Sequence, residues 1–189
     1  MRTLLRTLLV CLLAPAAAAW ADDKPAGASA KPASPNEFQK TAYGFVKATL
    51  LGSAEKMPEE NYGFKPADSV RSFGQVVGHV ADSQYFFCSA VLGEKNPALM
   101  IEKTKTSKAD LIASLRGAFA ACDRAHDGMT DASASETVKV FKSDMSKRDA
   151  LTANTMHGVE HYGNLVVYLR MKNIVPPSSE PGFTPEAKK

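Results

Sequence analysis

The stretch that decides the fold is residues 146–173, SKRDALTANTMHGVEHYGNLVVYLRMKN. Ser146 stands three residues before Asp149, which is the spacing expected where a serine caps the N-terminus of a helix. Apolar side chains from Leu151 to Leu165 then recur at helical spacing. Two prolines shortly after the segment end the pattern. The segment therefore predicts one long helix with an apolar face.

Three earlier segments begin in the same way. Ser34, Ser72 and Ser107 each precede an apolar run of helical period, and each has Glu, Gln or Asp three residues later. The second run extends to about Gly93 and the third to about Asp127. Amphipathic helices of this length must bury their apolar faces against one another, so the sequence predicts an all-α four-helix bundle.

The connections between the predicted helices are unequal in length. Residues 57–71 and 128–145 form long loops, so the pattern alone does not dictate an up-down-up-down order of helices. No segment shows a sustained alternation typical of a β-strand. The nearest is Thr137 to Phe141, which is short.

Three of the four histidines suggest a metal site. His157 and His161 are four residues apart, which places their imidazoles on one side of a helix and one turn apart. Leu165 continues on that side, so both rings should face the interior of the bundle or its mouth. His79, in an earlier helix, can complete a three-ligand site with an open coordination position, as in catalytic zinc sites. The alternative is a set of partly buried histidines satisfied by hydrogen bonds.

Imidazole suits zinc, nickel, iron and copper alike, so we expect a divalent metal ion and favour zinc or nickel. In an enzyme the ion would act as a Lewis acid, as in a metal-dependent hydrolase or transferase of unknown small-molecule substrate. The candidate catalytic groups are Asp82, which follows His79 by three residues, and Glu160, which precedes His161. Both acids can also be read as solvated helix residues. The competing class is a non-catalytic metal- or ligand-binding protein of the cell envelope.

The segment from His157 to His161 also fits the H-x-x-E-H pattern of inverzincin peptidases. That class needs a downstream acidic ligand on a second helix. The acids that follow, Glu180 and Glu186, lie in the C-terminal tail, so we do not favour a peptidase. The fourth histidine, His126, ends a predicted helix, where a cation would suit the negative end of the helix dipole.

The first 21 residues predict a secretory signal peptide. Arg2 and Arg6 precede an apolar run that is too short to span a bilayer, and residues 19–21 (Ala-Trp-Ala) fit a cleavage site. We therefore expect export to the periplasm and no stable membrane anchor. Cleavage would leave 21 basic and 20 acidic side chains, because the signal peptide holds two arginines and no acid. A net charge of +1 argues against a nucleic-acid partner.

Composition divides the remaining chain. Residues 22–35 and 178–189 show no periodicity, so we expect a disordered linker and a disordered tail around a domain at residues 36–177. Cys88 and Cys122 both fall in helical apolar patterns. They are read either as buried thiols or as a disulfide, which an oxidising compartment permits.

The domain resembles the DinB-like superfamily of helical metal proteins. The resemblance rests on MPEENYGFKP (57–66), VRSFGQ (70–75) with GHVAD (78–82), and HGVEHYGNLVVYLR (157–170) followed by IVPP (174–177). It implies that His79, His157 and His161 bind a divalent metal, that the helices run up-down-down-up, and that the protein forms a homodimer. Relatives include thiol-dependent S-transferases and isomerases. Their thiol cosubstrates are cytoplasmic, so the signal peptide argues against that activity.

Overall fold

The computed structural model describes residues 34–97 and 99–184. Within these residues the chain is mostly helical, with five α-helices, three 3-10 helices and one two-stranded sheet. The elements in chain order are α1 (Pro35–Lys56), η1 (Glu59–Asn61), α2 (Phe73–Leu92), α3 (Ile101–Thr104), α4 (Lys108–Asp127), η2 (Ser133–Ser135), β1 (Thr137–Val140), β2 (Ser143–Ser146), α5 (Lys147–Met171) and η3 (Pro177–Ser179). The expected signal peptide and most of the expected linker lie outside the described residues.

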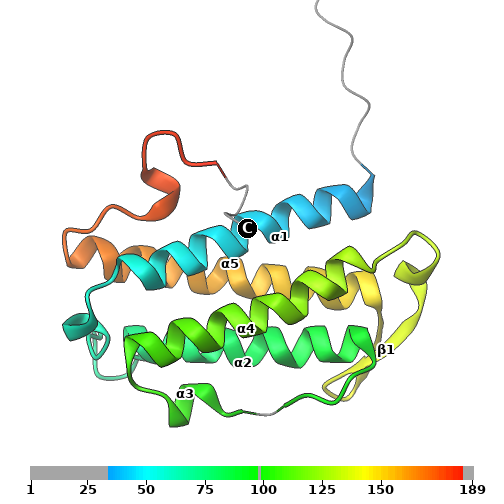
Figure 1. The fold of residues 1–189 in the computed structure, drawn as a ribbon, viewed down its shortest axis with the longest axis horizontal. Helices are drawn as coiled ribbons and strands as arrows, with labels where there is room; N and C mark the ends of the chain where they lie inside the picture. The colour runs from blue at the N-terminus through cyan, green and yellow to red at the C-terminus, as the bar shows by residue number, and fades with distance from the viewer. Residues whose placement is uncertain (1–33, 98, 185–189) are drawn as a thin grey trace, which may run out of the picture. The chain divides into compact units, whose positions relative to one another are not determined.

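Four long helices lie side by side and share one core (Figure 1). α2 packs against α4 and α5, and α1 packs against α5 and α4. A Cβ atom on Gly158 would come within 2.5 Å of Val46, so the missing side chain lets α5 approach α1 closely. Among the described residues, no helix combines the length and the apolar character needed to cross a bilayer.

The four predicted helix starts are present at the expected serines. Ser34 and Ser72 form complete capping boxes with Glu37 and Gln75, in which each side chain bonds the backbone N–H of the other residue. The hydroxyls of Ser107 and Ser146 each accept a backbone hydrogen bond from the aspartate three residues later. Each such cap stabilises its helix by about 1 kcal/mol.

The prediction of an all-α fold was wrong in one place. Residues 137–140 and 143–146 form a hairpin, with Val138 opposite Met145 and Val140 opposite Ser143. Val140 is fully buried and fixes the hairpin to the core. Two short strands have little apolar alternation of their own, so the hairpin depends on packing against the helices.

Cys88 and Cys122 form a disulfide that joins α2 to α4. Both cysteines are fully buried, as are the neighbouring polar side chains Gln84 and Asn154. Asn154 Nδ2 donates to Gln84 Oε1 over 2.8 Å, so the two amides satisfy part of each other's hydrogen-bonding capacity. The disulfide therefore lies in the core beside Asn154, which precedes His157 on α5 by three residues.

The tail departs from the prediction of disorder in its first residues. Ser178 accepts a hydrogen bond from the hydroxyl of Tyr162, and Lys56 forms an ion pair with Glu180. The ring of Phe183 meets that of Phe45 edge to face, with 6.0 Å between centroids. Individual contacts of this kind are not visible as a periodic pattern, which explains why composition suggested disorder.

Candidate metal centre

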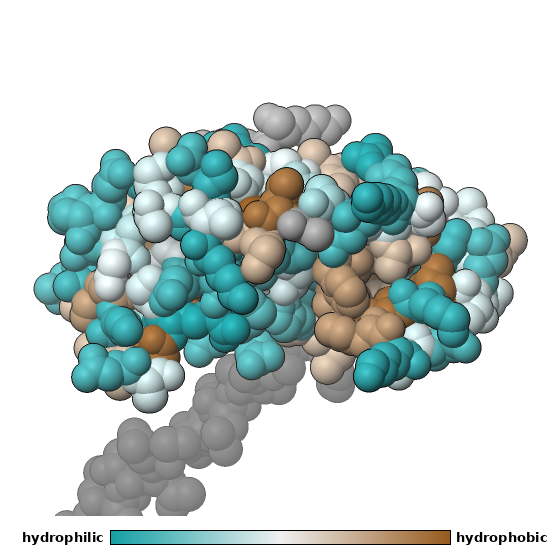
Figure 2. Space-filling model, turned by 90° about the horizontal axis from the view of Figure 1, so that it is seen from below, coloured by the Kyte–Doolittle hydropathy of each residue, from teal (hydrophilic) through white to brown (hydrophobic). Residues whose placement is uncertain are grey.

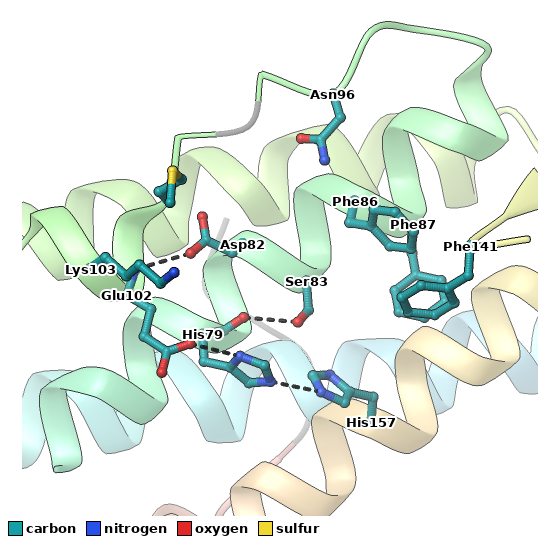
Figure 3. Close-up of a pocket in the computed structure, with 11 residues that line it drawn as sticks. His79, Asp82, Ser83, Phe86, Phe87, Asn96, Glu102, Lys103, Phe141 and His157 are labelled. Carbon is teal, nitrogen blue, oxygen red and sulfur yellow. Dashed lines mark hydrogen bonds and ion pairs between the residues drawn. The ribbon is translucent and has the colours of Figure 1, made fainter. Parts of the chain in front are cut away.

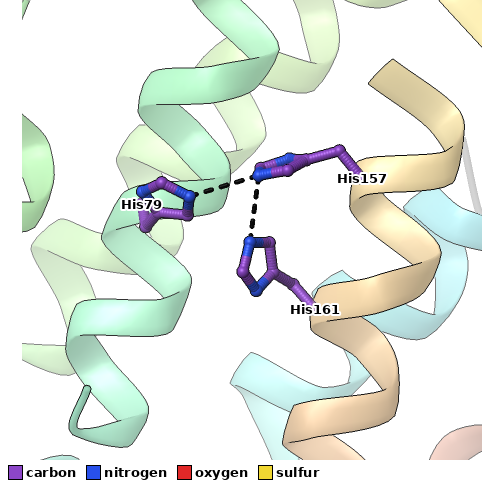
Figure 4. Close-up of side chains that lie close together, drawn as sticks. All are labelled: His79, His157 and His161. Carbon is purple, nitrogen blue, oxygen red and sulfur yellow. Dashed lines mark hydrogen bonds between the residues drawn. The ribbon is translucent and has the colours of Figure 1, made fainter. Parts of the chain in front are cut away.

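His79 from α2 and His157 and His161 from α5 point toward one another (Figure 4). The Nε2 atom of His157 lies 3.2 Å from Nε2 of His79 and 3.0 Å from Nε2 of His161. One ligand atom from each ring lies within 4.8 Å of the other two. Two metal bonds of about 2.1 Å that meet at roughly 90–110° separate their nitrogens by about 3.0–3.4 Å. The structure thus brings together the three histidines that the sequence singled out.

The surroundings keep the rings of His157 and His161 neutral. Burial, followed by the charge of the neighbouring histidines, lowers the pKa of His157 and lowers that of His161 to about 4. A neutral imidazole has one nitrogen with a lone pair, and three ring nitrogens directed at one point cannot all be satisfied by one another. The Nδ1 atoms of His157 and His161 are also buried without a hydrogen-bond partner among the described residues. The donor set fits a divalent cation, which would satisfy all three Nε2 atoms.

Glu102 orients the ring of His79. Its Oε2 atom lies 3.0 Å from Nδ1 of His79, and its Oε1 atom accepts from Nε of Arg71 over 2.8 Å. Burial opposes ionisation of Glu102, but the hydrogen bond and charge of Arg71, assisted by His79, outweigh it and lower the pKa of the carboxyl. An ionised carboxylate only accepts, so Nδ1 of His79 carries a hydrogen and Nε2 is the ring atom left to meet a metal ion.

Sequence reasoning missed Glu102, because it lies 23 residues from His79 in the chain. Its position depends on α3, which docks on α2. A Cβ atom on Gly78 would lie 2.7 Å from the Cα of Glu102, so only glycine permits this approach. A glycine next to His79 was the one sequence signal of a close backbone contact there.

Asp82 has a different place from the one expected of a catalytic group. Its Oδ1 and Oδ2 atoms accept from the backbone N–H groups of Ile101 and Glu102 over 2.9 and 3.0 Å. Both oxygens are therefore engaged in capping the start of α3, and Figure 3 shows one of these hydrogen bonds, to Glu102, as a dashed line. Asp82 thus holds Glu102 in place and does not itself approach the ring nitrogens.

Glu160, the other candidate base, is exposed on α5. It lines a cavity of about 800 Å³ together with His161, Arg71 and Tyr168. This cavity is the more polar of two that reach the histidines. Glu160 therefore lies on the exposed side of a cavity that reaches His161.

The second cavity, of about 500 Å³, reaches the same centre through His79 and His157. His79 and His157 line one end of it, and the aromatic rings of Phe86, Phe87 and Phe141 line the other (Figure 3). Its walls are mainly apolar. The three-histidine centre is accordingly open to small molecules through an apolar route and a polar route.

His126 is structural, as expected, but it is not a cation. Its ring is buried and stacks on Tyr43, with 3.9 Å between centroids and 17° between planes. Burial lowers the pKa of His126 to about 4, even though Asp123 and Asp127 oppose the shift. The predicted interaction of a charged imidazole with the helix dipole is therefore wrong at neutral pH.

Comparisons with known proteins agree with this architecture. A sequence model of the DinB superfamily matches residues 42–165. The structure is similar to that of a DinB-like protein from Bacillus cereus, with a TM-score of 0.65 and 16% identity over 74% of this chain and 93% of the other. A DinB-like protein from Bacillus subtilis is also similar, with a TM-score of 0.57 and 21% identity over 77% and 95% of the two chains. No curated protein matches in sequence. Because the family model spans most of the chain, this protein belongs to the DinB superfamily.

Proposed function

We propose that this protein is an exported metalloprotein in which His79, His157 and His161 hold a divalent metal ion that serves a reaction of a small molecule. The observation that carries the proposal is the convergence of three imidazole Nε2 atoms from two helices. Zinc or nickel is the expected ion, since imidazole suits both. A metal-dependent hydrolase or transferase is the activity class that fits an open three-ligand centre.

A divalent ion in this position would supply a Lewis acid with positions left open to ligands. The protein groups around it have separate tasks. Glu102 holds the hydrogen of His79 on Nδ1 and is itself held by Arg71. Asp82 and Gly78 keep α3, and with it Glu102, against α2. The two cavities that reach the histidines admit the reacting molecule to the open positions.

One observation favours the alternative of a non-catalytic metal- or ligand-binding protein. Both oxygens of Asp82 are occupied by backbone N–H groups, and Glu102 is occupied by Arg71 and His79. Glu160, which lines the same cavity as His161, is then an acid left for proton transfer, and it is exposed. Under the enzymatic proposal, Glu160→Gln lowers turnover without lowering metal content. Under the alternative, turnover of any small-molecule substrate is lacking in the metal-loaded parent as well.

The proposal includes a four-helix bundle with up-down-down-up order. It is supported by the pairing of α2 with α4 and α5, and of α1 with α5 and α4. In Figure 1 α2 and α4 run in the same direction, and α1 and α5 run opposite to them.

Export to the periplasm is also part of the proposal. It is supported by the signal-peptide pattern of the first 21 residues and by the disulfide between Cys88 and Cys122. Structural disulfides persist in oxidising compartments and are rare in the cytosol. Mass spectrometry of the protein recovered from the periplasm tests it, and an intact N-terminus starting at Met1 would contradict it.

Elemental analysis of the protein purified from its native compartment tests the metal centre. The parent should contain about one equivalent of metal, and His157→Gln and His161→Gln should lose most of it, because each removes one of three ligands. His126→Gln is the matched control, because His126 lies away from the centre, and it should retain the metal. Equal metal content in the parent and in His161→Gln would refute the proposal.

A further inference from the structure

We infer that the apolar cavity selects aromatic small molecules whose metal-binding head reaches the histidine centre. This inference rests on the proposed metal centre and adds a class of ligand to it. The cavity has about 500 Å³, which suits one small organic molecule. Its two ends differ in chemistry, because His79 and His157 lie at one end and three phenylalanines at the other.

The three phenylalanines form an aromatic wall. Phe86 and Phe87 are neighbours on α2, with 5.3 Å between ring centroids, and Phe141 comes from the turn of the hairpin. The Phe141 ring lies 4.6 Å from that of Phe86 and 6.0 Å, edge to face, from that of Phe87. Such separations are those of interacting aromatic pairs, and a ligand ring of the same size can join the cluster. Figure 2 shows an apolar patch toward the end of this face where the hairpin lies.

Phe141 adopts a backbone conformation that is unfavourable for phenylalanine. Its φ is +55°, in the left-handed region that favours glycine, and it occupies the first position of a two-residue turn between Val140 and Ser143. Its side chain is 76% exposed, so burial does not explain it. The buried Val140 next to it holds the hairpin in place. A strained, exposed aromatic residue at the mouth of a cavity is the arrangement expected where a side chain contacts a ligand.

The polar groups beyond the aromatic wall favour a ligand with a metal-binding head. The cavity passes from the phenylalanines along α2, past Ser83, to His79 and His157. Ser83 donates its hydroxyl hydrogen to the carbonyl of His79, so it lines the route without offering a charge. Asp82 and Glu102 also line the cavity, but their oxygens accept from other protein groups, so the metal held by the histidines and the ammonium of Lys103 are the attractions for a metal-binding head. An aromatic body and a metal-binding head therefore match the two ends.

The test uses two hydroxamates with the same metal-binding head, benzohydroxamate and acetohydroxamate, on the zinc-loaded mature protein. Isothermal titration calorimetry gives both dissociation constants. The parent should bind benzohydroxamate at least about tenfold more tightly, since ring contacts and apolar burial add to the shared head. Phe141→Ala should remove most of this ratio, and Phe86→Leu, which keeps apolar volume without the ring, should reduce it. Phe38→Ala is the control, because Phe38 is equally exposed on α1 but lines a different groove.

The outcomes separate the two proposals. If neither hydroxamate binds and no zinc is retained, the proposed metal centre fails and the ligand class falls with it. If both hydroxamates bind equally well, or if Phe141→Ala and Phe86→Leu leave the ratio unchanged, the metal centre stands and the aromatic ligand class is refuted. A loss of the ratio in both variants, with the Phe38→Ala ratio intact, supports the inference.

Discussion

Gly78→Ala should weaken metal binding although residue 78 touches no metal ligand atom. The new Cβ would lie 2.7 Å from the Cα of Glu102, whereas ordinary contact begins at 3.4 Å. α3 must therefore move away from α2 by about 0.7 Å. If the carboxylate of Glu102 moves by the same distance, its 3.0 Å contact with Nδ1 of His79 lengthens to about 3.7 Å, which is beyond hydrogen-bond range.

The magnitude follows from what that hydrogen bond does. Loss of a carboxylate that orients a metal-binding imidazole typically lowers metal affinity by about 10- to 100-fold. Folding is affected less, because crowding costs about 1–3 kcal/mol while replacing glycine inside a helix contributes about 0.8–1 kcal/mol in return. The free energy of unfolding of the metal-free protein should therefore fall by about 0–2 kcal/mol. The substitution should therefore change metal affinity more than it changes the stability of the metal-free protein.

Competition titration with a chelator measures the affinity, and urea denaturation of the metal-free protein measures the stability. Glu102→Gln should reproduce the loss of affinity without moving α3. Gly163→Ala is the control, since its Cβ meets nothing within 4 Å and it lies inside α5; it should leave affinity unchanged and stabilise the helix by about 1 kcal/mol. An affinity of Gly78→Ala within twofold of the parent would refute the link from α3 to the histidine centre.

Four further outcomes are expected. The buried His126, whose pKa is lowered to about 4, contributes stability that is complete above about pH 6.5 and is lost as the pH falls toward 4; the parent should thus lose about 3 kcal/mol more than His126→Gln over that range in denaturant titrations. Reduction of the disulfide, which closes a separation of 34 residues, should lower the free energy of unfolding by about 4 kcal/mol, and unchanged stability after reduction would contradict its structural role. A free metal concentration of about 100 times its dissociation constant should raise the free energy of unfolding of the parent by about 2.7 kcal/mol. The same metal concentration should not shift the melting temperature of His161→Gln. Phe141→Asn should be at least as stable as the parent, because asparagine tolerates the left-handed backbone; a loss above about 1 kcal/mol would show that Phe141 serves the fold.

The helices and the histidine pair were accessible from sequence because their signals are local. A serine with an acid or amide three residues later, and two histidines four residues apart, each lie within one or two turns of helix. Glu102 was not accessible in this way, since its contact with His79 depends on how α3 docks. Asp82 looked like a site residue because it is close in sequence, whereas its partners are backbone groups about 20 residues away. The disulfide likewise required knowing which faces of α2 and α4 meet.

α2 is the helix on which two cross-links meet. The disulfide fastens it to α4, and a bound metal would fasten it to α5 through His79. α1 takes part in neither and is held by packing, hydrogen bonds and ion pairs such as Lys47 with Asp123. Hydrogen exchange in the oxidised, metal-loaded protein should then begin at α1, while the other three long helices open together. If the chain is exported unfolded, as proposed above for its signal-peptide pattern, the disulfide and the metal cross-link would both form only after it reaches an oxidising compartment.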